Sequence, residues 1–269
     1  MFRTVQSSLL LSALLLTGVA LAHSGPGAHE QPSQQSQLPG DQARQDIKAA
    51  GAQREARQPH ATVEQYQDFE VLGWTLHVHE DLVAEEELFE EVRAELHHQL
   101  FRIVQVLPED RVEILQEVPV WVELRNPYSG NCQYHPSRQW LENNGYLPEK
   151  AQGIELSAAR GFLSSSRTTQ PFVMLHELAH AYHDRHLGFD HEGLIQRFRE
   201  AREAGSYDRV LHANGRRVRA YAMTDHKEFF AEATEAYFGQ NDFFPFVRAE
   251  LREHDQAMYD MVREVWGIE

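Results

Sequence analysis

Two histidines and a glutamate share one short stretch of the chain, in the order His176-Glu177-Leu178-Ala179-His180. Residues four apart lie on the same face of a helix, so the two imidazoles can meet one metal ion. Glu177 follows the first histidine and can act as general base toward a water molecule at the metal. If the stretch is helical, this spacing predicts one Zn²⁺ per chain and hydrolytic chemistry.

A catalytic zinc takes three protein ligands and keeps one position open, so one more ligand is needed. One candidate is His186, which has the spacing of the metzincin pattern H-E-x-x-H-x-x-G-x-x-H. That pattern needs glycine at its eighth position, where the chain turns out of the helix, but this chain has His183 there. If the helix continues, His186 lies about 15 Å along the axis from His176, too far to share a metal ion.

The other candidate is Glu228, the first residue of the stretch EFFAE. Glu228 and Glu232 are four residues apart and share one face of a second expected helix. In gluzincin-type sites a glutamate of a second helix binds zinc, and a carboxylate one turn later makes a hydrogen bond to a ligand histidine. Glu228 as ligand and Glu232 as that partner fit this arrangement. The alternative is that Glu228 only completes a capping box that begins at Asp225.

Two stretches, HELAHAYH (176–183) and YAMTDHKEFFAEATEAYF (221–238), resemble the catalytic domain of anthrax toxin lethal factor and its relatives, which include secreted bacterial Pro-Pro endopeptidases. The specific likeness covers roughly 171–238. Nothing in the first 150 residues resembles the substrate-recruiting domains of the toxin, so toxin function is not implied.

The resemblance implies a zincin-like zinc endopeptidase with a defined set of site residues. In such a site His176, His180 and Glu228 bind the metal and Glu177 is the base. A tyrosine seven residues before the glutamate ligand points at the active site in that family, and Tyr221 has this spacing here. Tyr221 is therefore expected to assist catalysis.

The elements that must position these residues can be read from the surrounding pattern. Gln170-Pro171 opens the first helix and Leu187-Gly188 ends it. The second helix is expected over about 225–238. Asn214-Gly215 between two polar-apolar runs predicts a hairpin, which carries Tyr221 toward the start of the second helix.

Upstream, alternating residues predict strands over 72–79 and 118–124, and an amphipathic helix over about 82–106. A short strand is expected at Gly153–Leu156, as a possible sheet edge that pairs with an extended substrate. Further helices are expected over about 192–204 and in the C-terminal part. The predicted fold class is α+β, a small twisted sheet over an active-site helix with a helical C-terminal part.

The chain divides into three predicted parts. Residues 1–22 have the charge, apolar run and A-x-A end of a signal peptide, which predicts a secreted or periplasmic protein with no stable membrane insertion after cleavage. Residues 23–65 are a low-complexity segment, expected to be a disordered linker. Residues 66–269 form the predicted metallopeptidase domain. A net charge of −16 argues against nucleic-acid binding, and Cys132, the single cysteine, excludes an intramolecular disulfide.

The sequence therefore predicts a secreted zinc endopeptidase that acts on a peptide or protein substrate. One alternative is a non-catalytic extracellular zinc-binding or scaffold protein that keeps the zincin fold. Another is a metal-dependent amidase that acts on cell-wall peptides. An open cleft at the metal favours an enzyme, whereas a fourth protein ligand favours a binding protein.

Overall fold

The computed structural model describes residues 59–129 and 132–268, and all structural statements concern these residues. The predicted signal peptide and residues 23–58 of the predicted linker lie outside them. The last residues assigned to the linker are part of the folded domain, since Ala61 is buried and His60 Nε2 lies 2.7 Å from a carboxylate oxygen of Glu123. The ordered domain thus begins before Tyr66, the predicted start.

Five short strands form one mixed sheet in the order β1-β2-β3-β5-β4. β2, β3 and β5 run parallel to one another, and β1 and β4 pair antiparallel at the two edges. The strands are β1 (Tyr66–Val71), β2 (Trp74–His79), β3 (Val120–Val122), β4 (Cys132–Tyr134) and β5 (Ile154–Leu156). The alternation predicted for β2 is confirmed, because Trp74, Leu76 and Val78 are all buried in the core.

The edge of the sheet differs from the prediction. β5 lies between β3 and β4, so the Gly153–Leu156 segment is an inner strand and the edge strand is β4. All three residues of β5 are buried, as expected of a strand with neighbours on both sides. β4 was not predicted, because three residues in a turn-rich segment are too few to show a strand period.

Helices make up most of the remaining domain, which is α+β as predicted. Those before the histidine stretch are α2 (Glu80–Val83), α3 (Glu86–Val106), α4 (Glu109–Gln116), α5 (Arg138–Asn144) and α6 (Ala159–Ser166). Those from it onward are α7 (Val173–Tyr182), α8 (Glu192–Ala204), α9 (His226–Phe238), α10 (Arg248–His254) and α11 (Gln256–Trp266). No helix within the described ranges has both the length and the apolar character needed to cross a membrane.

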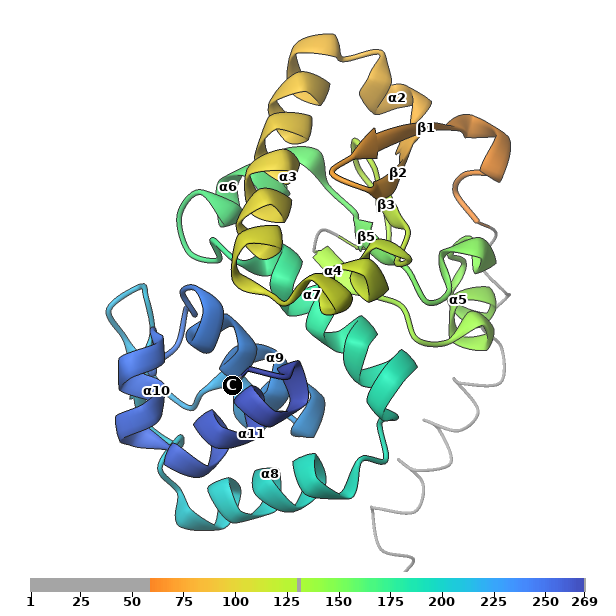
Figure 1. The fold of residues 1–269 in the computed structure, drawn as a ribbon. Helices are drawn as coiled ribbons and strands as arrows, with labels where there is room; N and C mark the ends of the chain where they lie inside the picture. The colour runs from red at the N-terminus through yellow and green to blue at the C-terminus, as the bar shows by residue number, and fades with distance from the viewer. Residues whose placement is uncertain (1–58, 130–131, 269) are drawn as a thin grey trace, which may run out of the picture. The chain divides into compact units, whose positions relative to one another are not determined.

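α7 crosses the domain between the sheet and the C-terminal helices (Figure 1). Nine of its ten residues are buried, the exception being the half-buried His180, so this helix is enclosed on nearly all sides. The chain continues through a π-helical turn, His183–Leu187, and leaves it at Gly188, whose φ of 81° suits glycine. The helix predicted through the histidine stretch is confirmed.

α9 packs against α7 and begins with a side-chain cap. The Asp225 carboxylate accepts hydrogen bonds from the backbone N–H groups of Lys227 (2.8 Å) and Glu228 (3.1 Å). Before it come the predicted hairpin, β6 (Val210–Leu211) with β7 (Arg217–Val218), and a 3₁₀ turn at Tyr221–Met223. The hairpin and helix together bring a second set of side chains to the face of α7.

Candidate metal centre

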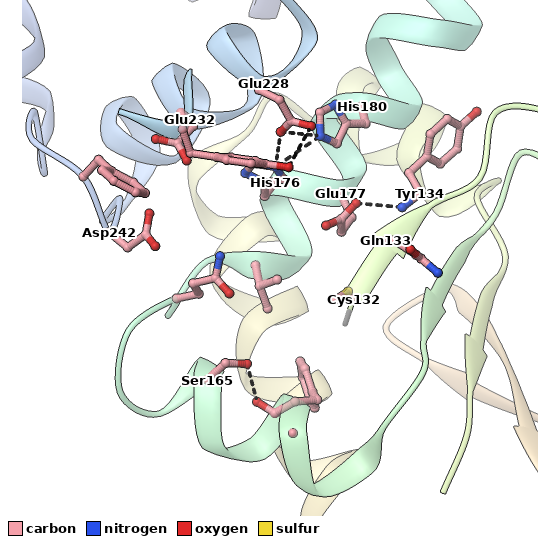
Figure 2. A pocket seen from close by; sticks show the side chains of 16 residues that line it. Cys132, Gln133, Tyr134, Ser165, His176, Glu177, His180, Glu228, Glu232 and Asp242 are labelled. Atoms are coloured by element: carbon pink, nitrogen blue, oxygen red, sulfur yellow. Dashed lines mark hydrogen bonds and ion pairs between the residues drawn. The ribbon is translucent and has the colours of Figure 1, made fainter. Parts of the chain in front are cut away.

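Three side chains from α7 and α9 converge on one point (Figure 2). His176 Nε2 lies 3.1 Å from His180 Nε2, and Glu228 Oε2 lies 3.1 Å from the first and 3.3 Å from the second. These three groups offer ligand atoms within 4.8 Å of one another. Two imidazoles and a carboxylate at this spacing are a donor set that a divalent metal ion can use.

Glu228 serves both as a capped residue and as a member of this cluster. Its backbone N–H is bonded to Asp225, but its carboxylate points at the two histidines rather than back at the helix start. Burial works against its charge, yet the two imidazoles outweigh burial and hold the pKa of Glu228 well below its usual value. Glu228 can therefore take part in the Asp225 cap through its backbone and in the cluster through its side chain.

His176 is held in place by a second carboxylate. Its Nδ1 lies 2.6 Å from Glu235 Oε1, and Glu235 is buried. A proton on Nδ1 that is donated to Glu235 leaves the lone pair of Nε2 directed at the cluster. Burial opposes a charge on His176, but the carboxylates of Glu235 and Glu228 outweigh it and raise the pKa of His176.

The structure differs here from the prediction for Glu232, to which the sequence assigned the hydrogen bond on a ligand histidine. Glu232 is buried nearby, but its Oε2 accepts from Asn241 Nδ2 at 3.0 Å. Glu235 makes the predicted bond instead. A signal was present in the sequence, because Glu235 is seven residues, two full turns, after Glu228 and so shares its face. Which of the two carboxylates reaches His176 depends on the rotation of α9 against α7.

Glu177 lies on α7 beside the cluster and is contacted by the edge strand. Its Oε2 accepts a hydrogen bond of 2.7 Å from the backbone N–H of Tyr134 on β4. Burial raises the pKa of Glu177, although the two neighbouring imidazoles oppose this. The backbone donor is a site group that no side-chain pattern in the sequence could indicate.

Tyr221 lies at the rim of the cluster, as the resemblance implied. Its hydroxyl donates to Glu228 Oε1 across 3.4 Å, and about half of the residue is exposed. Burial of the phenol and the charge of Glu228 raise the pKa of Tyr221, so it is a neutral donor at pH 7. Its contribution to a reaction stays a prediction.

The other histidines of the stretch lie outside the cluster. His186 stacks on the ring of Tyr182, with ring centroids 5.3 Å apart. His191 caps α8 by accepting from the Leu194 N–H. His183 is fully buried among aromatic rings. The continued helix keeps His186 away from the cluster, as the sequence argument expected.

A cavity of about 700 Å³ opens at the cluster. Four carboxylates line it, from Glu177, Glu228, Glu232 and Asp242 (Figure 2). Among the described residues that line the cavity there is no Lys or Arg. A second group, His176 with Glu232 and Glu235, also offers ligand atoms within 4.8 Å of one another, and it shares only His176 with the first group. Carboxylates and imidazoles that face one cavity, with no Lys or Arg in its lining, are donors that suit a divalent cation, so the residues present fit a metal ion.

Comparisons of the chain with models of known protein families, with curated proteins and with solved structures found no match.

Proposed function

We propose that this protein is a zinc-dependent endopeptidase, related to the zincin-like enzymes that its motifs resemble. The observation that carries the proposal is the His176–His180–Glu228 cluster at the wall of a large cavity, with Glu177 beside it. Three ligands and access for a substrate are typical of catalytic zinc, whereas structural zinc is closed by four protein ligands. This favours an enzyme over a zinc-binding scaffold.

Zinc in this cluster would lower the pKa of a water molecule and polarise the carbonyl of the scissile peptide bond. Glu177 then has the role of general base, because it lines the cavity and its Oε1 has no hydrogen-bond partner among the described residues. The carboxyl group takes a proton from the attacking water and returns it to the leaving amine. Tyr221 stands where its hydroxyl can donate to the developing oxyanion.

The substrate of such an enzyme is an extended peptide, and β4 supports this choice over a compact ligand. β4 is the edge of the sheet, and all three of its residues, Cys132, Gln133 and Tyr134, line the cavity. An edge strand can pair with an extended chain through its backbone. Secretion remains part of the proposal, since the predicted signal peptide lies outside the described residues.

The decisive experiment combines metal analysis with a peptide library. The wild-type protein should contain one zinc per chain and cut internal peptide bonds, and a chelator should abolish cleavage until zinc is restored. Glu177→Gln should keep its zinc and lose turnover by about 10²–10⁴-fold, because it keeps the shape of the side chain and loses its basicity. Zinc without any cleavage would favour the scaffold alternative, and release of cell-wall peptides alone would favour the amidase.

A further inference from the structure

Glu155 is a fully buried carboxylate on β5 that the proposed reaction does not use. Its Oε2 accepts from Gln133 Nε2 at 3.2 Å and from His135 Nε2 at 2.8 Å. Its Oε1 accepts from Asn126 Nδ2 at 2.8 Å and from the ammonium group of Lys150. A carboxylate offers about four acceptor positions, so every one of them is in use.

Two of the four donors lie on either side of Tyr134 in the chain. Gln133 and His135 turn their side chains toward Glu155, while the N–H of Tyr134 points away from β5 and meets Glu177 at 2.7 Å. β4 pairs with β5 over three residues. The backbone pairing continues at His135, whose N–H donates to Gly153 O at 3.0 Å and whose carbonyl oxygen accepts from the Gln152 N–H at 2.7 Å. The bonds from Gln133 and His135 to Glu155 add side-chain hydrogen bonds to this backbone pairing, one on each side of Tyr134.

We propose that Glu155 is a positioning residue, which holds β4 at the place where the Tyr134 N–H binds the carboxylate of Glu177. This inference rests on the proposed function, because it matters for catalysis only if Glu177 is the base. A displacement of about 1 Å in a catalytic group can lower a rate about 100-fold. The position of β4 therefore matters for the rate, because the Tyr134 N–H binds the carboxylate of Glu177.

Tyr134 is also held by a contact of its side chain, and the effect of this contact must be distinguished from that of Glu155. The phenol of Tyr134 donates to Asp184 Oδ2 at 2.8 Å, which links its ring to the π-helical turn after α7. If this bond alone places Tyr134, then Tyr134→Phe releases the amide and changes at Glu155 do not. If Glu155 places the strand, the opposite result is expected.

Glu123 provides a matched control. It is buried like Glu155 and shares the same Lys150 ammonium, but its other partners are His60 and Tyr66 rather than β4. Glu155→Met and Glu123→Met each remove one carboxylate and leave Lys150 with one carboxylate partner. Methionine accepts no strong hydrogen bond, so neither variant replaces the lost acceptor. Loss of stability common to both variants is structural, whereas an effect found only in Glu155→Met concerns β4.

The test measures hydrogen exchange of the Tyr134 amide in the full chain. The Glu177→Ala variant lacks the acceptor of this amide and gives the exchange rate expected when the bond is lost. Glu155→Met should raise the exchange rate by about tenfold or more, and Glu123→Met should leave it near the wild-type rate. Gln133→Met, a partly exposed change that folds more safely, should raise it by a smaller factor. Equal exchange in both Met variants, or release by Tyr134→Phe alone, would overturn the inference.

Activity gives a second readout that a purely structural role would not move. Glu155→Met should keep one zinc per chain and lose kcat about 100-fold, while Glu123→Met keeps its kcat. If the wild type cleaves no peptide, the proposed function fails, and hydrogen exchange alone still decides whether Glu155 places Tyr134.

Discussion

Glu228 and His186 compete as third ligand, and single substitutions separate them. Glu228 Oε2 lies within 3.3 Å of both Nε2 atoms of the cluster, whereas His186 stacks on Tyr182. Glu228→Ala should lose most zinc affinity, because two imidazoles from one helix are one ligand short of a catalytic site. His186→Ala should bind zinc like the wild type. Zinc titration measures both, and the reverse order would return the protein to the metzincin pattern.

Glu235 and Glu232 differ in their contact with His176, and this difference is also testable. Glu235→Leu should weaken zinc binding by about 10–100-fold, since it removes the acceptor that orients the His176 ring. Glu232→Leu is the matched control, a buried carboxylate whose bond goes to Asn241. It should change zinc affinity less. A larger loss in the Glu232 variant would show that the original sequence assignment was correct.

Tyr221 is expected to act through its hydroxyl alone. Tyr221→Phe keeps the half-exposed ring and removes the donor that lies 3.4 Å from Glu228 Oε1. An oxyanion donor acts in the transition state, so kcat should fall about 100-fold with little change in KM or zinc content. Wild-type turnover in this variant would leave Tyr221 as a packing residue. Weaker zinc binding instead would mean that its hydroxyl serves Glu228.

At the level of elements, the π-helical turn after α7 begins with a histidine that no hydrogen bond satisfies. Both ring nitrogens of His183 lack partners within the described chain, and the rings of Phe189, His226 and Phe230 surround it. Burial lowers the pKa of His183 to about 3, and nearby cationic groups add to this effect. His183 is therefore neutral in the folded protein at pH 5–7.

This burial makes stability depend on pH with a definite sign. The unfolded chain protonates His183 near its ordinary pKa of 6.5, while the folded chain does so only near 3. Stability from this group is complete above pH 6.5 and is lost as pH falls toward 3. Between pH 7 and pH 5 the loss is about 2 kcal/mol.

His183→Leu should remove that component, so its free energy of unfolding falls less than the wild type's between pH 7 and pH 5. Urea melts at the two pH values measure the difference between the chains. If the free energy of unfolding changes equally between pH 7 and pH 5 in both chains, His183 is not buried in its neutral form. His186→Ala is a suitable control, because that histidine is exposed in the same turn.

At the scale of the whole molecule, the described domain should fold without the first 58 residues. A chain that starts at Pro59 keeps every contact of the described domain, and should melt cooperatively with unchanged zinc content. A chain that starts at Tyr66 loses the buried Ala61 and the bond from His60 to Glu123. It should lose about 2 kcal/mol, roughly 4–8 °C in Tm.

Calorimetry of the two shortened chains measures this difference directly. Equal melting temperatures would mean that residues 59–65 contribute nothing and that the predicted boundary at Tyr66 was adequate. Loss of zinc from the chain that starts at Pro59 would instead assign the first 58 residues a role in forming the site.

The sequence by itself determined the local features of this protein. His176, Glu177 and His180 belong to one helix, so the helical period alone predicts their common face. The cap at Asp225, the hairpin at Asn214-Gly215 and the alternation in β2 are likewise local. Each depends on residues a few positions apart, and all of them are found in the structure.

Only the tertiary structure decided how these elements meet. His176 and Glu235 are 59 positions apart, and the rotation of α9 against α7 chose Glu235 over Glu232 as the partner of His176. The contact between β4 and Glu177 could not be predicted from the sequence either. The N–H of Tyr134 is a backbone group, and its partner, Glu177, is 43 positions away. A period within one element cannot encode such contacts, since they arise from packing between elements that are distant in the chain.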